Sequence, residues 1–160
     1  MTTQRNIKYQ TLNDTDTQIA KDIIAQCDYG VLSTADNAGF PYGVPLHHVL
    51  TGNSIYFHFL STEREIANII QNDKVSMTFV SDYAINENTF TTYYESTIIE
   101  GIAQPITDRN EKRHALRLLC QRFAPNCIKE AEQMPFAQLL QIGIIRIDIS
   151  HINLKIHKHQ

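Results

Sequence analysis

A chain of 160 residues with 42% hydrophobic residues fits one domain with its own core, so a disordered chain is excluded. Its 14 Lys and Arg against 17 Asp and Glu give a net charge of −3, and they form no basic stripe. A general binder of nucleic-acid backbones is therefore excluded. No apolar run is long enough to cross a bilayer, no secretory signal opens the chain, and three cysteines lack a CxxC pair. We expect a single domain over 1–160, cytoplasmic, with no membrane partner and an N-terminal arm over 1–13.

The first half of the chain begins with one helix and continues with strands. Thr15 and Gln18 form a capping-box pattern, which predicts an amphipathic helix over Asp16–Cys27. Turn residues then separate three segments, the first rich in β-branched and aromatic residues and the other two alternating between apolar and polar positions. We predict an antiparallel meander of strands at Tyr29–Ala35, Phe40–Leu50 and Ser54–Leu60.

The middle of the chain repeats this pattern. A second capping box, Thr62 with Glu65, predicts a helix that ends near Asn72. The next strand is expected at Lys74–Val80, and the polar stretch Ser81–Asn88 is expected to be a loop. A long extended segment follows over Phe90–Ile106, and Gly101 inside it indicates a bend or bulge.

The last third contains a helix and then closes the sheet. Asp108 and Glu111 form a third capping box, and the helix after it carries the apolar stripe Leu116, Leu119, Cys120 and Phe123. A short helix is expected at Pro135–Leu140. Two strands, Ile142–Ile149 and Ile152–Ile156, are predicted to be separated by a break at Ser150-His151. The fold class is mainly β (α+β), a small antiparallel barrel of six to seven strands with two to four peripheral helices.

A candidate anion site lies where the strand at Ser54–Leu60 leads into the next helix. A helix N-terminus presents free N–H groups and the positive end of the helix dipole. Ser61 and Thr62 add hydroxyl donors there, and Arg64 adds a forked cation suited to phosphate. The alternative is an ordinary capped helix with a solvated arginine.

A second candidate is the segment Gly43–His48. Pro45 removes one N–H from the strand ladder, and Gly43 permits close approach of another group. A flat ring could lie against this strand and use its free backbone groups and the imidazoles; the alternative is an edge strand with exposed histidines. His58 lies beside the candidate anion site. The seven histidines lack the spacing of zinc ligands, so no metal site is predicted, and no motif names a catalytic residue.

The ordered series of segments resembles the pyridoxamine 5'-phosphate oxidase-like flavoproteins, and within them the nitroimidazole-resistance (Nim-type) branch. The resemblance is carried by YGVLSTADNAGFPYGVPLHHV, SIYFHF, REIANIIQNDKVSMTFV and TTYYESTIIEGIAQPITDRNEKRHALRLL. It implies an FMN-binding split β-barrel that forms a homodimer with two flavin sites at the interface. The strand Gly43–Val49 would line the isoalloxazine ring, the turn Ser61–Arg64 would hold the phosphate, and Thr92–Ser96 would contribute from the partner. The expected FMN-binding residues are Val44, Pro45, Leu46, His47, His58, Ser61, Thr62, Arg64 and Ser96.

The resemblance also implies an activity, that of an FMN-dependent oxidoreductase with a small substrate, nitroaromatic compounds included. Two departures qualify it. Nim-type relatives carry Gly-x-Lys where this chain reads Glu63-Arg64-Glu65, and vitamin B6 oxidation is not assigned because the chain has no Trp and its tail lacks an Arg-x-His motif. The alternatives are a non-catalytic split-barrel dimer that binds flavin or haem, and a structural dimer that has lost its cofactor.

Overall fold

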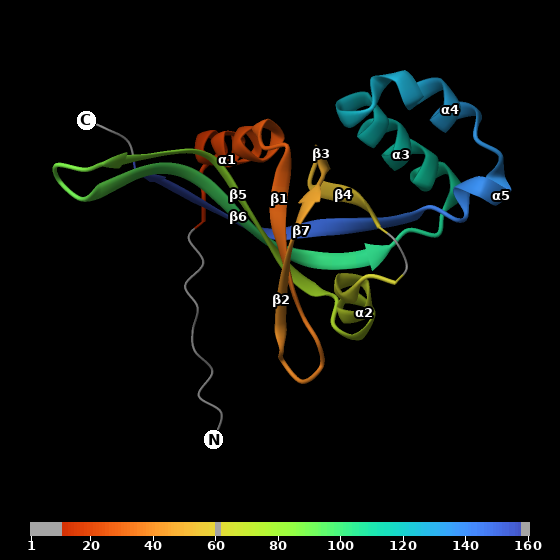
Figure 1. The fold of residues 1–160 in the computed structure, drawn as a ribbon, viewed down its shortest axis with the longest axis horizontal. Helices are drawn as coiled ribbons and strands as arrows, with labels where there is room; N and C mark the ends of the chain where they lie inside the picture. Colours follow the sequence, from red (N-terminus) through yellow and green to blue (C-terminus); the bar gives the residue numbers. More distant parts are fainter. Residues whose placement is uncertain (1–10, 60–61, 158–160) are drawn as a thin grey trace.

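The computed structural model describes residues 11–59 and 62–157, and it consists of one curved sheet flanked by helices (Figure 1). All pairings in the sheet are antiparallel, and the strand order is β2-β1-β5-β6-β7-β4-β3. The strands are β1 Tyr29–Ala35, β2 Pro41–His47, β3 Val49–Thr51, β4 Ser54–Phe59, β5 Lys74–Asn86, β6 Thr91–Pro105 and β7 Gly143–His157. The helices are α1 Asp14–Gln26, α2 Arg64–Gln71, α3 Arg109–Phe123, α4 Ile128–Gln133 and α5 Phe136–Leu139, with a 3-10 turn at Pro125–Cys127.

These elements confirm the mainly β class and the seven-stranded antiparallel architecture of a split barrel. The described residues contain five α-helices rather than two to four, because the segment after α3 folds into the short helices α4 and α5. Most of the predicted N-terminal arm lies outside the described residues. No helix in the described part of the chain is long and apolar enough to span a bilayer.

Helix α1 begins earlier than its predicted capping box. The side chain of Asn13 accepts a hydrogen bond from the backbone N–H of Asp16 at 2.8 Å, so Asn13 is the N-cap and the assignment of Thr15 is wrong. Asparagine in an extended conformation is a strong N-cap, and here it precedes Thr15 in the chain. The helix buries Ala20, Ile23 and Ile24 against the sheet.

The predicted strand Phe40–Leu50 is two strands, β2 and β3, separated by His48. Strand β2 pairs only with β1, whereas β3 pairs with β4 at the opposite end of the sheet. The His48 ring is fully buried at this change of partner, and its Nε2 donates to the carbonyl of Ile24 at 2.9 Å. Alternation of side chains continues through His48, which is why the sequence pattern missed the break.

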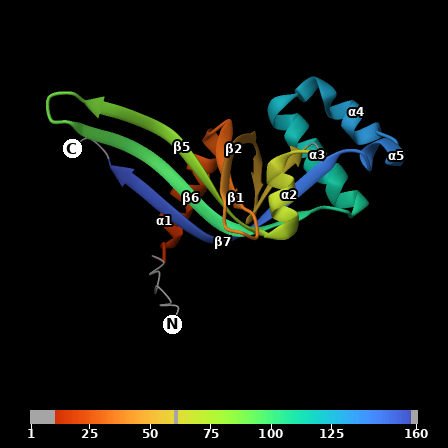
Figure 2. The ribbon, with the colours of Figure 1, turned by 60° about the horizontal axis from the view of Figure 1, so that its bottom comes forward.

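The predicted loop Ser81–Asn88 is mostly strand. Strand β5 continues to Asn86 and pairs with β6 after a bulge between Val80 and Asp82. This end of the hairpin extends away from the helices, together with the end of β7 (Figures 1 and 2). Both of its faces are largely solvated beyond Val80, and the short alternation of Tyr83 and Ile85 stands among polar residues that are typical of a loop.

Strand β7 is continuous, so the predicted break at Ser150-His151 is wrong. Glu100 pairs with His151 and Gly101 with Ile149, which leaves Ser150 as the extra residue of a bulge. The predicted irregularity at Gly101 is confirmed, because a Cβ atom there would collide with the backbone carbonyl of Asp148.

Two apolar clusters hold the helices against the sheet. The larger lies between α1, α2 and the sheet and includes Phe57, Met77, Phe79, Ile99 and Ile145. The smaller joins α3 to β4 and β7 through residues that include Tyr56, Ala115, Leu119 and Ile144. The predicted cap of α3 is confirmed, since the Asp108 carboxylate accepts from the Glu111 N–H at 2.8 Å. Helix α2 packs on β1 and β2. We call the region where the start of α2 meets the edge strand β2 the mouth of the sheet.

Candidate functional site

Strand β2 is an edge strand, and it carries four of the predicted ligand-binding residues. Its only partner in the described sheet is β1, with Val44 opposite Leu32 and Pro45 opposite Val31. Pro45 and His47 are exposed, whereas the side chains of Val44 and Leu46 are partly buried against the core. The unpaired side of an edge strand leaves backbone groups available to a ligand. The structure therefore shows Pro41–His47 as an edge strand with His47 exposed, whereas His48, the other imidazole of the predicted segment Gly43–His48, is fully buried.

The second predicted feature, the start of α2, stands next to this strand. The Arg64 guanidinium lies over the Tyr42 ring of β2, with 4.7 Å from its Cζ to the ring centroid. Arg64 and Thr62 are exposed. An arginine stacked on an aromatic ring keeps its N–H groups free at the rim of the guanidinium plane. Tyr42 of β2 thus orients the Arg64 guanidinium at this mouth of the sheet.

The predicted capping box at this helix is wrong. The N-cap of α2 is Glu63, which makes no side-chain cap bond, and the helix begins at Arg64. The Glu65 side chain is buried, with 3% of the residue exposed, and therefore does not project into solvent beside Arg64. A carboxylate in the first turn is favoured by the helix dipole, which explains why it is tolerated there. Ser61 lies outside the described residues.

His47 and His58 meet at the same small cavity. The cavity has a volume of about 150 Å³, and its remaining lining comes from α3 and its end: Leu116, Leu119, Cys120, Phe123 and Ala124. His47 packs on Phe123 with 4.7 Å between ring centroids, and its Nδ1 donates to the carbonyl of Asp28 at 2.8 Å. Because a carbonyl can only accept, the proton of a neutral His47 ring is on Nδ1 and its Nε2 is an acceptor.

Ser96 is not beside these residues within one chain. It lies on β6, opposite Val80 of β5 and Lys155 of β7, and two strands separate β6 from β2. Its side chain is buried, and its hydroxyl donates to the Lys155 carbonyl at 3.3 Å. Any shared site that includes Ser96 would need a second copy of the chain.

Comparison with known proteins places this geometry in a family. The sequence profile described as pyridoxamine 5'-phosphate oxidase matches residues 16–156. The chain belongs to this family. No protein of curated function matches it in sequence.

Solved structures of the pyridoxamine 5'-phosphate oxidase-like fold agree. A candidate 5-nitroimidazole antibiotic resistance protein from Bacteroides thetaiotaomicron is 21% identical, with a TM-score of 0.73 over 92% of this chain and 86% of that one. A FAD and heme binding protein from Mycobacterium smegmatis is 15% identical, with a TM-score of 0.76 over 95% and 75%. A flavocytochrome from Azotobacter vinelandii is 17% identical, with a TM-score of 0.72 over 95% and 69%. At these identities the likeness is one of fold.

Sequence reasoning missed three features of the site in this family member. The ring of Tyr42 supports Arg64, although 22 positions separate them. The apolar stripe of α3 was predicted, but nothing in the sequence indicated that it faces His47 and His58. Arg122 of the same helix was also missed; it donates to the carbonyls of Ala25 and His48 and so joins α1 to the end of β2. A signal for such contacts would require pairs of positions that vary together.

Proposed function

We propose that this protein is an FMN-dependent oxidoreductase that acts on a small aromatic substrate as a homodimer. The observation that carries the proposal is the Arg64 guanidinium on the Tyr42 ring, at the free edge of β2. When bound, FMN supplies the redox chemistry by exchanging a hydride or single electrons with substrates. The chain's own residues supply binding, orientation and exclusion of water.

The residues at the start of α2 fit a phosphate group. Arg64 offers a forked donor, Thr62 an exposed hydroxyl, and the first turn of α2 its free backbone N–H groups. The carboxylates of Glu63 and Glu65 on either side of Arg64 oppose an anion at this turn, and burial of Glu65 does not weaken that opposition. Ser61 completes the proposed turn but is outside the described residues. We assign the phosphate of FMN to this turn.

The edge of β2 fits the flat ring. Val44, Pro45, Leu46 and His47 present a strand whose outer backbone groups have no partner strand in the described sheet. The Asp28 carbonyl holds the Nδ1 proton of His47, so His47 Nε2 can accept a proton or a hydrogen bond from a bound molecule. The apolar wall from α3 beside His47 and His58 suits a small aromatic substrate. We assign no catalytic residue.

The outer faces of β1 and β5 support the proposed dimer. Tyr29, Val31 and Val80 are exposed apolar side chains that line one shallow hollow. Tyr83 and Ile85 are further exposed apolar residues on the part of β5 that follows Val80. Exposed apolar patches of this kind are typical of protein interfaces. A partner seated there would lie over the part of the sheet that contains Ser96, opposite Val80.

The phosphate assignment is tested by comparing FMN with riboflavin, which lacks the phosphate. Fluorescence titration of the full chain should give tighter binding of FMN, and Arg64→Ala should weaken FMN binding by about 10- to 150-fold while leaving riboflavin unchanged. Arg109→Ala is the matched control, because Arg109 is also exposed and stacks on a ring, that of Phe136, at 4.9 Å. Equal FMN affinity in Arg64→Ala and the native chain would refute the assignment.

Two further measurements separate the remaining functions. FMN-loaded protein that oxidises NADH or NADPH with a nitroaromatic or quinone acceptor is an enzyme, whereas loaded protein without turnover supports the non-catalytic flavin binder. Val31→Asp should dissociate the proposed dimer into monomers in sedimentation, and the monomers should lose FMN. A native chain that sediments as a monomer with FMN bound would refute the interface site.

A further inference from the structure

A second cavity lies at the end of β4 and shares no lining residue with the cavity of His47 and His58. It has a volume of about 580 Å³ and lies among the end of β4, the end of β6, the start of α3 and the start of β7. Its walls are largely apolar, with Phe59, Ile106 and Ile142 among them, and Thr62 and Thr107 add hydroxyl groups. The one charged side chain in its lining is Lys112.

Lys112 is buried, with 7% of the residue exposed. Its Nζ donates one hydrogen bond, to the Leu140 carbonyl at 3.3 Å. Among the described residues no carboxylate lies within salt-bridge distance of this ammonium group. An ammonium group has three N–H donors, so two remain without a protein partner in the described part of the chain. Burial of such a charge without compensation is costly.

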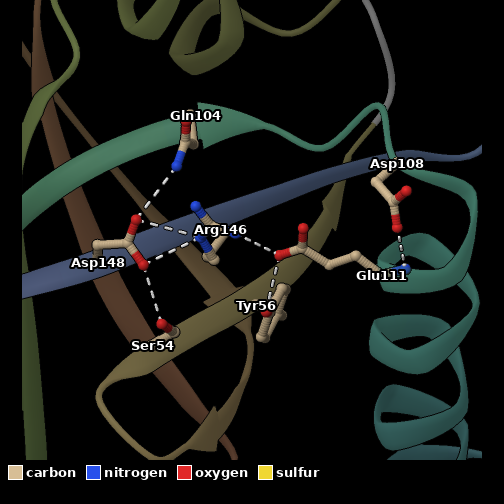
Figure 3. A network of polar contacts seen from close by, with 7 residues as sticks. All are labelled: Ser54, Tyr56, Gln104, Asp108, Glu111, Arg146 and Asp148. Atoms are coloured by element: carbon tan, nitrogen blue, oxygen red, sulfur yellow. Dashed lines mark hydrogen bonds and ion pairs between the residues drawn. The ribbon is translucent and has the colours of Figure 1, made fainter.

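The carboxylates nearest in sequence already have other partners. Asp108 caps α3 through the Glu111 N–H, and Glu111 accepts from Arg146 at 2.5 Å and from the Tyr56 hydroxyl at 2.9 Å (Figure 3). Lys112 also lies near the N-terminal end of α3, where the helix dipole disfavours a cation. Folding alone therefore gives little reason for a lysine here, whereas a bound anion would supply the missing partner and benefit from the same helix end.

We propose that this cavity binds a small organic anion, a carboxylate or a phosphate ester with an apolar body, and that Lys112 is its charge partner. The ammonium group meets the anionic oxygens, Thr107 adds a hydroxyl, and the apolar walls cover the rest of the molecule. This site does not depend on flavin binding. It shares only Thr62 with the proposed phosphate turn, and Arg64 does not line it.

The test uses benzoate, phenyl phosphate and the neutral benzyl alcohol as probes for calorimetry on the full chain. Benzoate or phenyl phosphate should bind and benzyl alcohol should bind at least 10-fold more weakly; the stronger of the two anions identifies the headgroup. Lys112→Met should weaken anion binding by about 10-fold or more. Lys129→Met, at an exposed position on α4, is the matched control and should bind as the native chain does.

Two checks locate the site and protect the test against misfolding. Backbone amide NMR signals of Thr107, Lys112 and Ile142 should shift on addition of the anion, and Thr107→Val should weaken binding by about 2- to 10-fold without altering the apolar walls. FMN binding to Lys112→Met should equal that of the native chain. Native protein that ignores both anions, Lys112→Met that binds them equally well, or Lys112→Met that loses FMN would each overturn the proposal.

Discussion

Arg146 on β7 and Arg64 on α2 carry the same charge, but the folded chain gives ion-pair partners to Arg146 and, among the described residues, none to Arg64. Arg146 bonds to Glu111 at 2.5 Å and to Asp148 at 3.0 Å, and Asp148 also accepts from Ser54 and Gln104 (Figure 3). The hydrogen bond with Glu111 raises the pKa of Arg146 above its ordinary value. Each charge in this network has an oppositely charged partner. The network joins α3 to β4 and β7, because Glu111 lies on α3 and its partners lie on the two strands.

Arg64 differs because the described residues give it an aromatic ring and no ion pair. Its side chain is exposed at the mouth, next to an edge strand. Arg146 therefore has its charge neutralised within the fold, whereas Arg64 has a charge available to a bound anion. Groups inside the fold should affect stability, whereas groups at the mouth should affect binding.

The largest effect on the structural side is expected from His48. Burial lowers the pKa of this ring from 6.5 to about 4, and its Nδ1 has no hydrogen-bond partner among the described residues. The unfolded chain therefore binds more protons between these pH values, and the free energy of unfolding should fall by about 3 kcal/mol as pH drops from 7 to 4. Urea unfolding at several pH values measures this. His48→Gln, which keeps an amide donor for Ile24, should remove this part of the pH dependence, and equal slopes in both proteins would contradict it.

The next effect contrasts the two arginines directly. Arg146→Ala leaves the Glu111 carboxylate partly buried without its cation, so we expect a loss of about 2–3 kcal/mol in the free energy of unfolding. Arg64→Ala should cost less than about 0.5 kcal/mol, because its side chain is exposed. Chemical denaturation measures the free energy of unfolding of both variants. Similar losses in the two would contradict the distinction between a structural and an exposed arginine.

A smaller effect separates the capping boxes at α3 and α2. Asp108→Ala removes the side-chain acceptor of the Glu111 N–H and should destabilise the protein by about 1 kcal/mol. Thr62→Ala should leave stability almost unchanged, because the N-cap of α2 is Glu63. Thermal unfolding of the two variants provides the measurement. A cost at Thr62 equal to that at Asp108 would restore the capping role that its sequence pattern suggests.

The smallest effect concerns the ring under Arg64. Tyr42→Leu should weaken FMN binding by about 0.5–1 kcal/mol, because the guanidinium loses the aromatic face that directs it. Tyr42→Phe keeps the face and serves as the control, so its FMN affinity should match that of the native chain. Fluorescence titration measures both. If Tyr42→Leu bound FMN as tightly as Tyr42→Phe, the ring would play no part in orienting Arg64.

The sequence predicted the elements whose signal is local. Strand Tyr29–Ala35 has its predicted bounds, because its β-branched and aromatic residues favour a strand and turn residues follow it directly. The cap at Asp108 was predicted correctly, since the side-chain acceptor and the N–H that it binds are three residues apart. Pro45, which cannot donate to a neighbouring strand, indicated the edge position of the strand that runs to His47.

Local periodicity, turn residues, one helix cap and, through ordered motifs, the family could all be predicted from the amino-acid order. Only the folded sheet shows that His48 divides a strand, that β5 stays paired with β6 as far as Asn86, and that His47 and His58 line one cavity with α3. It also placed Arg64 on Tyr42 and left Lys112 buried without a described counter-charge. The reason is physical: periodicity and capping depend on neighbours within a few residues, whereas burial and charge pairing depend on segments that only the folded sheet brings together.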